Sequence, residues 1–128
     1  MTMQNKILWV LQWLFGVYFV AVGIMHLVLP EGLPEPLSWM YDLDDTRHML
    51  SGVAEILGGL GLILPSLTRI APWLTPLAAI GLMIVMIAAI LFHVGRDEIA
   101  NVGINVFNLL VLGYIAWGRS RLVPIVAR

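Results

Sequence analysis

Residues 73–94 read WLTPLAAIGLMIVMIAAILFHV, a stretch that contains no Asp, Glu, Lys or Arg. A bilayer core about 30 Å thick is crossed by about 20 helical residues, so this stretch is long and apolar enough to span a membrane. The rest of the chain agrees, because 60% of its 128 residues are hydrophobic and only 12% are charged. A soluble domain of this length needs more polar surface. We therefore expect an integral membrane protein with one domain, residues 1–128.

Charged residues and prolines divide the remaining sequence into further apolar segments of similar length. The second of these is expected to end before Pro65 and contains four glycines, which is typical of a helix that packs closely against its neighbours. The predicted fold class is all-α: a polytopic membrane protein with a bundle of four transmembrane helices. The expected spans are residues 7–29, 48–64, 73–94 and 100–117, with a long loop at 30–47.

The basic residues predict how the bundle is oriented, since the side richer in Lys and Arg faces the cytoplasm. Both termini and the 65–72 connection are therefore expected to be cytoplasmic. The loop 30–47 and the turn 95–98 are expected to face outward. The expected cytoplasmic side carries Lys6, Arg69, Arg119, Arg121 and Arg128, and the other side carries Arg47 and Arg96.

The loop 30–47 is rich in apolar and aromatic residues, which predicts a segment lying in the headgroup region. We interpret its acidic cluster as a cap, in which Asp44 or Asp45 accepts hydrogen bonds from the first free amides of the second helix. A cation site is the alternative interpretation.

Composition also limits the chemistry and the partners. The chain has no cysteine, so it has no thiol for redox work and any redox chemistry needs a bound cofactor or another subunit. A net charge of −1 gives no reason to expect a nucleic-acid partner.

Five polar side chains fall within the expected spans, all in their outer halves. Helical spacing places each of them on a stripe of polar or small residues, and these stripes are expected to turn away from lipid toward a common pocket that opens outward. An ionised carboxylate near mid-membrane is costly and usually retained for a purpose, whereas histidines near the interface and buried asparagines also have structural roles. We predict Glu55 as the catalytic, proton-carrying residue and His26, His93, Asn105 and Asn108 as cofactor contacts.

Three segments carry a resemblance to a known family: GIMHLVLP (23–30), GVAEILGGLGLILP (52–65) and VMIAAILFH (85–93). Together with a polar-faced last helix, they resemble the DoxX-like family of small four-helix membrane proteins. The resemblance covers the chain from about Phe15 to Arg121. It implies a multi-pass protein of a bacterial or archaeal plasma membrane, the cell inner membrane in bacteria. It also implies a quinone-linked redox setting in which His26, Glu55 and His93 match the family's recurring polar positions.

Two classes of function are then open, only one of them enzymatic. In the first, the chain is a subunit or small enzyme of quinone-linked membrane redox chemistry, with Glu55 carrying a proton and His26 or His93 donating to a quinone oxygen. Haem or metal binding by the same residues is a variant that the absence of HxxxH and ExxH spacing disfavours. The alternative is a non-catalytic assembly partner, or a small proton-coupled transporter with Glu55 as the coupling acid. The expected partners are the lipid bilayer, a redox partner subunit and further copies of the chain.

Overall fold

The computed structural model describes all 128 residues and is helical, with no strands. Four of its helices are long and apolar enough to cross a membrane, which confirms the predicted class and number of spans. These four are α1 (Met3–Leu27), α2 (Asp45–Thr68), α3 (Leu74–Val94) and α4 (Ile99–Trp117). A 3-10 helix, η1 (Glu35–Asp42), lies between α1 and α2, and a short π-helical segment, η2 (Gly118–Leu122), follows α4.

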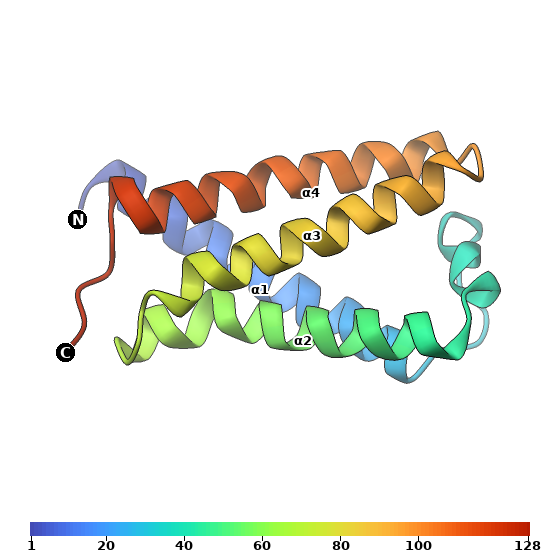
Figure 1. Ribbon diagram of the computed structural model, residues 1–128, viewed down its shortest axis with the longest axis horizontal. Coiled ribbons are helices and arrows are strands. Elements are labelled where there is room, and N and C mark those ends of the chain that lie inside the picture. Colours follow the sequence, from blue (N-terminus) through green and yellow to red (C-terminus); the bar gives the residue numbers. More distant parts are fainter.

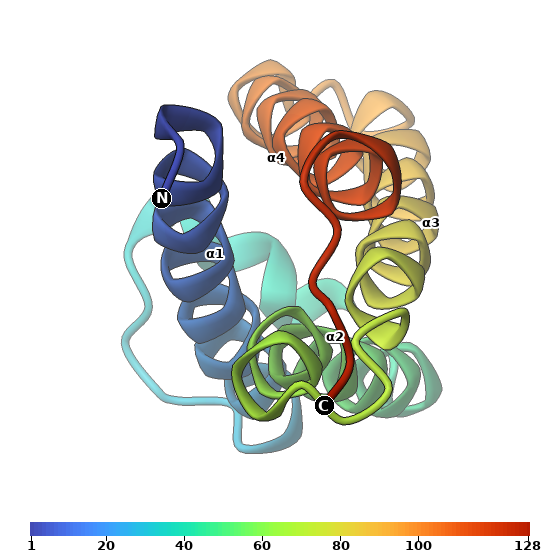
Figure 2. The ribbon, with the colours of Figure 1, turned by 90° about the vertical axis from the view of Figure 1, so that its left-hand side faces the viewer.

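Successive helices run in opposite directions, so both termini lie at the same end of the bundle (Figure 1). We call this the terminal end, and we call the opposite end, which carries residues 28–44 and 95–98, the loop end. Seen along the bundle, the helices surround a common axis in the order α1, α2, α3, α4 (Figure 2). Neighbours in this order pack together, whereas α1 and α4 touch at few places. Which end faces the cytoplasm stays a prediction from the basic residues.

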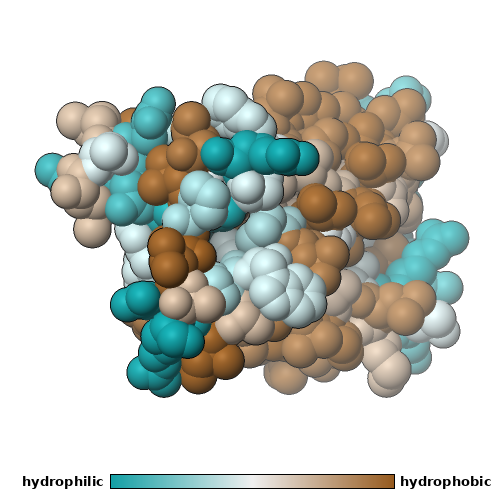
Figure 3. All heavy atoms as spheres, turned by 60° about the vertical axis from the view of Figure 1, so that its left-hand side comes forward, coloured by the Kyte–Doolittle hydropathy of each residue, from teal (hydrophilic) through white to brown (hydrophobic).

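Hydrophilic and apolar side chains occupy different parts of the surface of the bundle. Figure 3 shows hydrophilic side chains gathered over the terminal end and apolar side chains along the flank behind it. Large apolar residues such as Leu14, Ile87 and Leu110 are exposed on α1, α3 and α4. In water this exposure would be costly, whereas in a bilayer these side chains meet lipid tails.

Glycines bring α1 and α2 into backbone contact. A Cβ atom added to Gly59 would lie 2.6 Å from the carbonyl oxygen of Gly16, and one added to Gly52 would lie 2.9 Å from that of Gly23. Only residues without a side chain fit at such a distance, as in other closely packed membrane helices. The contact fixes the register of α1 on α2.

Two expectations about α2 need correction, and one is confirmed. The helix does not end before Pro65 but continues through it to Thr68, and it begins at Asp45, inside the segment predicted as a loop. Proline removes one backbone hydrogen bond, and a hydrogen bond of 2.8 Å between the hydroxyls of Ser66 and Thr75 ties this last turn to α3. The predicted acidic cap is Asp44, whose carboxylate accepts from the Arg47 amide at 2.9 Å.

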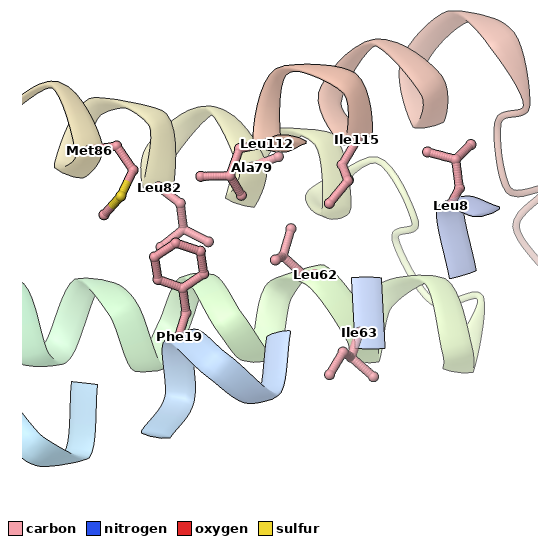
Figure 4. Close-up of a cluster of buried hydrophobic side chains, with 9 residues drawn as sticks. All are labelled: Leu8, Phe19, Leu62, Ile63, Ala79, Leu82, Met86, Leu112 and Ile115. Carbon is pink, nitrogen blue, oxygen red and sulfur yellow. The ribbon is translucent and has the colours of Figure 1, made fainter. Parts of the chain in front are cut away.

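The hydrophobic core fills the half of the bundle nearer the terminal end. Figure 4 shows side chains from all four helices meeting there, with Phe19 of α1 pointing toward Leu82 of α3. Buried ionisable side chains of the helices, His26, His48, Glu55 and His93, lie nearer the loop end. The core residues are Leu8, Phe19, Leu62, Ile63, Ala79, Leu82, Met86, Leu112 and Ile115.

One polar cluster joins α1 to the end of α4, where the two helices otherwise have few contacts. Arg119 of η2 is only 4% exposed and donates hydrogen bonds to Gln12 at 2.6 Å and to Asn5 at 2.8 Å. The Gln12 amide in turn donates to the Leu62 carbonyl at 2.7 Å. Arg119 was expected as a basic residue flanking the membrane, but its side chain is part of the interior.

Candidate functional site

A cavity of about 810 Å³ occupies the loop-end half of the bundle. Residues of all four helices and of η1 contribute to its wall, and 14 of the 20 lining residues are hydrophobic. Its edge includes the exposed side chains of Leu50, Ile84 and Leu91, which belong to α2 and α3. These two helices diverge toward the loop end (Figure 1). The cavity therefore opens sideways, between α2 and α3, toward the region that lipid occupies.

Three ionisable side chains form a connected chain beside this cavity. His48 Nε2 lies 2.8 Å from the Met40 carbonyl oxygen, and the Nδ1 atoms of His48 and His26 are 2.8 Å apart. His26 Nε2 then lies 3.7 Å from Glu55 Oε2. All three side chains are at most 8% exposed, so their protons are shielded from bulk water. We call Met40 O, His48, His26 and Glu55 the histidine–glutamate chain.

The backbone carbonyl at one end of the chain sets the tautomers of both histidines. A carbonyl oxygen only accepts, so His48 Nε2 carries the hydrogen and, in the neutral ring, Nδ1 accepts. His26 Nδ1 must then donate to it, which leaves the lone pair of neutral His26 on Nε2, facing Glu55. A single proton held between His26 and Glu55 keeps this pair neutral overall, whichever residue carries it.

Two residues that line the cavity each carry a polar atom without a hydrogen-bond partner in the protein. These atoms are Trp39 Nε1, a donor, and Glu55 Oε2, and both are buried. The Trp39 ring belongs to η1 and packs against both histidines of the site, with ring centroids 4.8 Å from His93 and 6.0 Å from His26. Buried polar groups are nearly always paired, so each of these two atoms is a candidate contact for a molecule from outside the chain.

His93 reaches the site from the end of α3 and is held by the turn that follows. Its Nδ1 donates to the Glu98 carboxylate at 3.0 Å, and Arg96 donates to Glu98 at 2.8 Å and to Asp42 of η1 at 2.7 Å. Burial alone would raise the pKa of Glu98, but the hydrogen bonds from Arg96 and His93 outweigh it and hold that pKa below its usual value. The network fixes η1, and with it Trp39, over the loop end of the cavity.

Four of the five predicted site residues line this cavity: His26, Glu55, His93 and Asn105. The fifth, Asn108, is buried deeper in the bundle, where its amide lies 3.9 Å from Met86 Sδ. Asn108 is thus placed for packing between α3 and α4, and a role in ligand binding stays a prediction for it.

The prediction missed His48, Trp39 and Glu98. A signal existed for His48, because it precedes Gly52 and Glu55 with the i, i+4, i+7 spacing of one helix face. Glu98 follows His93 by five residues across a turn, and helical periodicity stops at such a turn. Trp39 reaches the site because η1 folds back over the bundle, which no spacing in the sequence indicates.

The residues do not fit a metal ion or a haem. No group of three His, Asp or Glu side chains converges to hold a metal ion. His26 has neither nitrogen free for iron, because Nδ1 is hydrogen-bonded to His48 and Nε2 faces Glu55. The donor set instead suits hydrogen bonding to an organic molecule.

The four spans make this chain a multi-pass integral membrane protein. Within that class, a model of the DoxX-like family matches residues 10–116, nearly the whole chain. The chain belongs to the DoxX-like family, as the resemblance of its three segments predicted. Comparisons with curated proteins and with solved structures gave no match.

Proposed function

We propose that this DoxX-like protein is a membrane subunit or small enzyme of quinone-linked redox chemistry, and that its cavity holds the quinone ring. One observation carries the proposal: Trp39 and Glu55 line the same mainly apolar cavity, and each carries a buried polar atom without a hydrogen-bond partner, Nε1 and Oε2 respectively. A quinone is a flat apolar ring with two polar carbonyl groups, so it matches both the wall and the unpaired atoms.

The side chains divide into donors and a proton carrier. Trp39 Nε1 donates to one carbonyl oxygen of the ring, and His93, held by Glu98, is available to the same ligand. Glu55 exchanges a proton with the other oxygen, since its Oε2 has no other partner and His26 Nε2 lies close enough to receive or return that proton. When bound, the quinone would supply redox chemistry that takes up two electrons and two protons; the His26–Glu55 pair holds one of these protons, and the other must come from outside this pair.

The histidine–glutamate chain confines the exchanged proton to the pair formed by His26 and Glu55. The tautomers that Met40 O imposes direct the lone pair of His26 toward Glu55, so the base is oriented before a ligand arrives. The chain has no cysteine and no residues that converge on a metal ion. We therefore propose that a partner subunit delivers or removes the electrons.

A proton-coupled transporter would also use a buried carboxyl group and histidines. It needs a route from the cavity to the opposite end of the bundle. Phe19, Leu62 and Leu82 are at most 1% exposed and belong to the core that fills the terminal half of the bundle (Figure 4). This packing favours a cavity that exchanges its ligand with the bilayer over a path across it.

The proposal is tested by what the protein binds. The protein purified in mild detergent is analysed by mass spectrometry, and we expect a quinone in amounts close to one per chain. Glu55→Gln removes the exchangeable proton while keeping the shape of the side chain, so it is expected to lower quinone content and the rate of quinone reduction in membranes. Glu31→Gln, at an exposed position of the loop, is the matched control. Quinone-free wild-type protein that takes up none when quinone is added would refute the proposal.

A further inference from the structure

A second hollow adjoins the cavity along the seam between α2 and α3. It is a groove of about 350 Å³ on the outer side of the bundle, and it shares Ala54 with the cavity wall. From Ala54 it runs along α2 as far as Pro65, 11 residues further on, which is about 16 Å along a helix axis. Cavity and groove thus lie end to end along the seam between α2 and α3.

The groove exists because small residues replace side chains along its floor. On α2 these are Gly58 and Gly61, and on α3 Ala78 and Gly81, while the exposed Leu57 and Leu77 lie on its two sides. A Cβ atom added to Gly81 would have no heavy atom within 4 Å, whereas one added to Gly58 would lie 2.5 Å from Leu82. The space above Gly81 is therefore open and is not taken up by helix packing.

We propose that the ligand of this protein is an amphiphile with a linear apolar tail, whose polar ring occupies the cavity and whose tail lies in the α2–α3 groove. The proposal rests on the quinone proposal for the cavity and specifies the substrate class: a quinone that carries its membrane tail, not a free ring. The two hollows adjoin at Ala54, and we assign the groove to the same molecule because of this adjacency. The sideways opening past Leu50, Ile84 and Leu91 gives such a molecule entry from the bilayer.

The lining of the groove has no polar side chain, so it offers nothing to a second head group. A bulk lipid chain could also lie in it. The two occupants differ in one respect: the tail of a bound quinone is covalently attached to its ring, so a blocked groove must weaken binding of a tailed quinone selectively.

The test compares two probes that share a ring, dimethoxymethylbenzoquinone without a tail and decylubiquinone with one. Their binding to detergent-purified protein is followed by quenching of tryptophan fluorescence, since Trp39 borders the cavity. Gly81→Phe adds a ring at a groove residue whose Cβ would have no heavy atom within 4 Å. Gly103→Phe makes the same change on α4, at an exposed glycine that also has no heavy atom within 4 Å of its added Cβ.

We expect Gly81→Phe to weaken binding of decylubiquinone about ten-fold, the usual size of a steric penalty in a filled site, and to change binding of the tail-less probe less than two-fold. Gly103→Phe should leave both affinities unchanged. Equal losses for both probes, or no loss for decylubiquinone, would overturn the tail assignment alone. Failure of wild-type protein to bind either probe would overturn the quinone proposal itself and this inference with it.

Discussion

His48→Ala removes the residue that links the Met40 carbonyl to His26, and it tests whether the histidine–glutamate chain orients the site. The substitution leaves two buried polar groups without a partner, the Met40 carbonyl oxygen and the His26 Nδ1–H. Met40 is 1% exposed and His26 is 5% exposed, so in the wild-type protein both groups are shielded from bulk water.

The magnitude follows from these two groups. Each buried polar group that loses its partner costs about 1–3 kcal/mol, which gives about 2–6 kcal/mol for the pair. Because the space vacated by the imidazole admits a water molecule, which restores part of the hydrogen bonding, the lower end of this range applies. We expect the free energy of unfolding to fall by about 2–3 kcal/mol.

The measurement is an unfolding titration with a denaturing detergent in mixed micelles, followed by circular dichroism. His48→Gln is the matched variant, because its amide group can donate to Met40 O and accept from His26 Nδ1. It is expected to recover at least half of the lost stability. If His48→Ala were as stable as wild type, or if His48→Gln were as unstable as His48→Ala, the assigned tautomers would be refuted.

Two further predictions concern helix packing and the turn at the loop end. Gly59→Ala would place a Cβ atom 2.6 Å from the Gly16 carbonyl oxygen, so the same titration should show a free energy of unfolding lower by about 1–3 kcal/mol. Gly103→Ala, whose Cβ lies in open space, should leave the free energy of unfolding unchanged. A Gly59→Ala variant as stable as wild type would contradict the close contact. The pKa of Glu98 in the folded protein is held below its unfolded value of about 4.3. The ionised Glu98 side chain therefore contributes its full stabilisation above the unfolded pKa. This stabilisation is lost as the pH falls through the folded pKa. The melting temperature of wild type should therefore drop more steeply below about pH 4 than that of Glu98→Gln, and parallel pH profiles would contradict the ion pair with Arg96.

The sequence was sufficient for the four spans and for four of the 20 residues that line the cavity. A span is decided by length and apolarity, which are local properties, and the stripes of His26, Glu55 and His93 follow from helical spacing alone. The end of α2 was mispredicted because a single proline was given more weight than the packing of the turn around it. That packing, including the Ser66–Thr75 hydrogen bond, joins two helices and is not a property of either segment.

The rest of the site depends on contacts between elements distant in the sequence. Trp39 enters the cavity because η1 folds over the bundle and Arg96 binds Asp42, 54 residues away. The α2–α3 groove likewise exists only because small residues of two helices face one another. Apolar and small residues at these positions fit lipid-facing and protein-facing surfaces equally well, so composition does not distinguish them.

Arg119 also bears on how the bundle assembles. Its hydrogen bonds reach Gln12 and Asn5, which precede it by 107 and 114 residues, so the partners of the first helix are synthesised at the other end of the chain. During insertion α1 can pair with α2 through its glycines at once, but its glutamine has no side-chain partner until η2 arrives. We expect the α1–α4 side of the bundle to close last, and a chain stalled before α4 to stay open on that side to membrane proteases and chaperones.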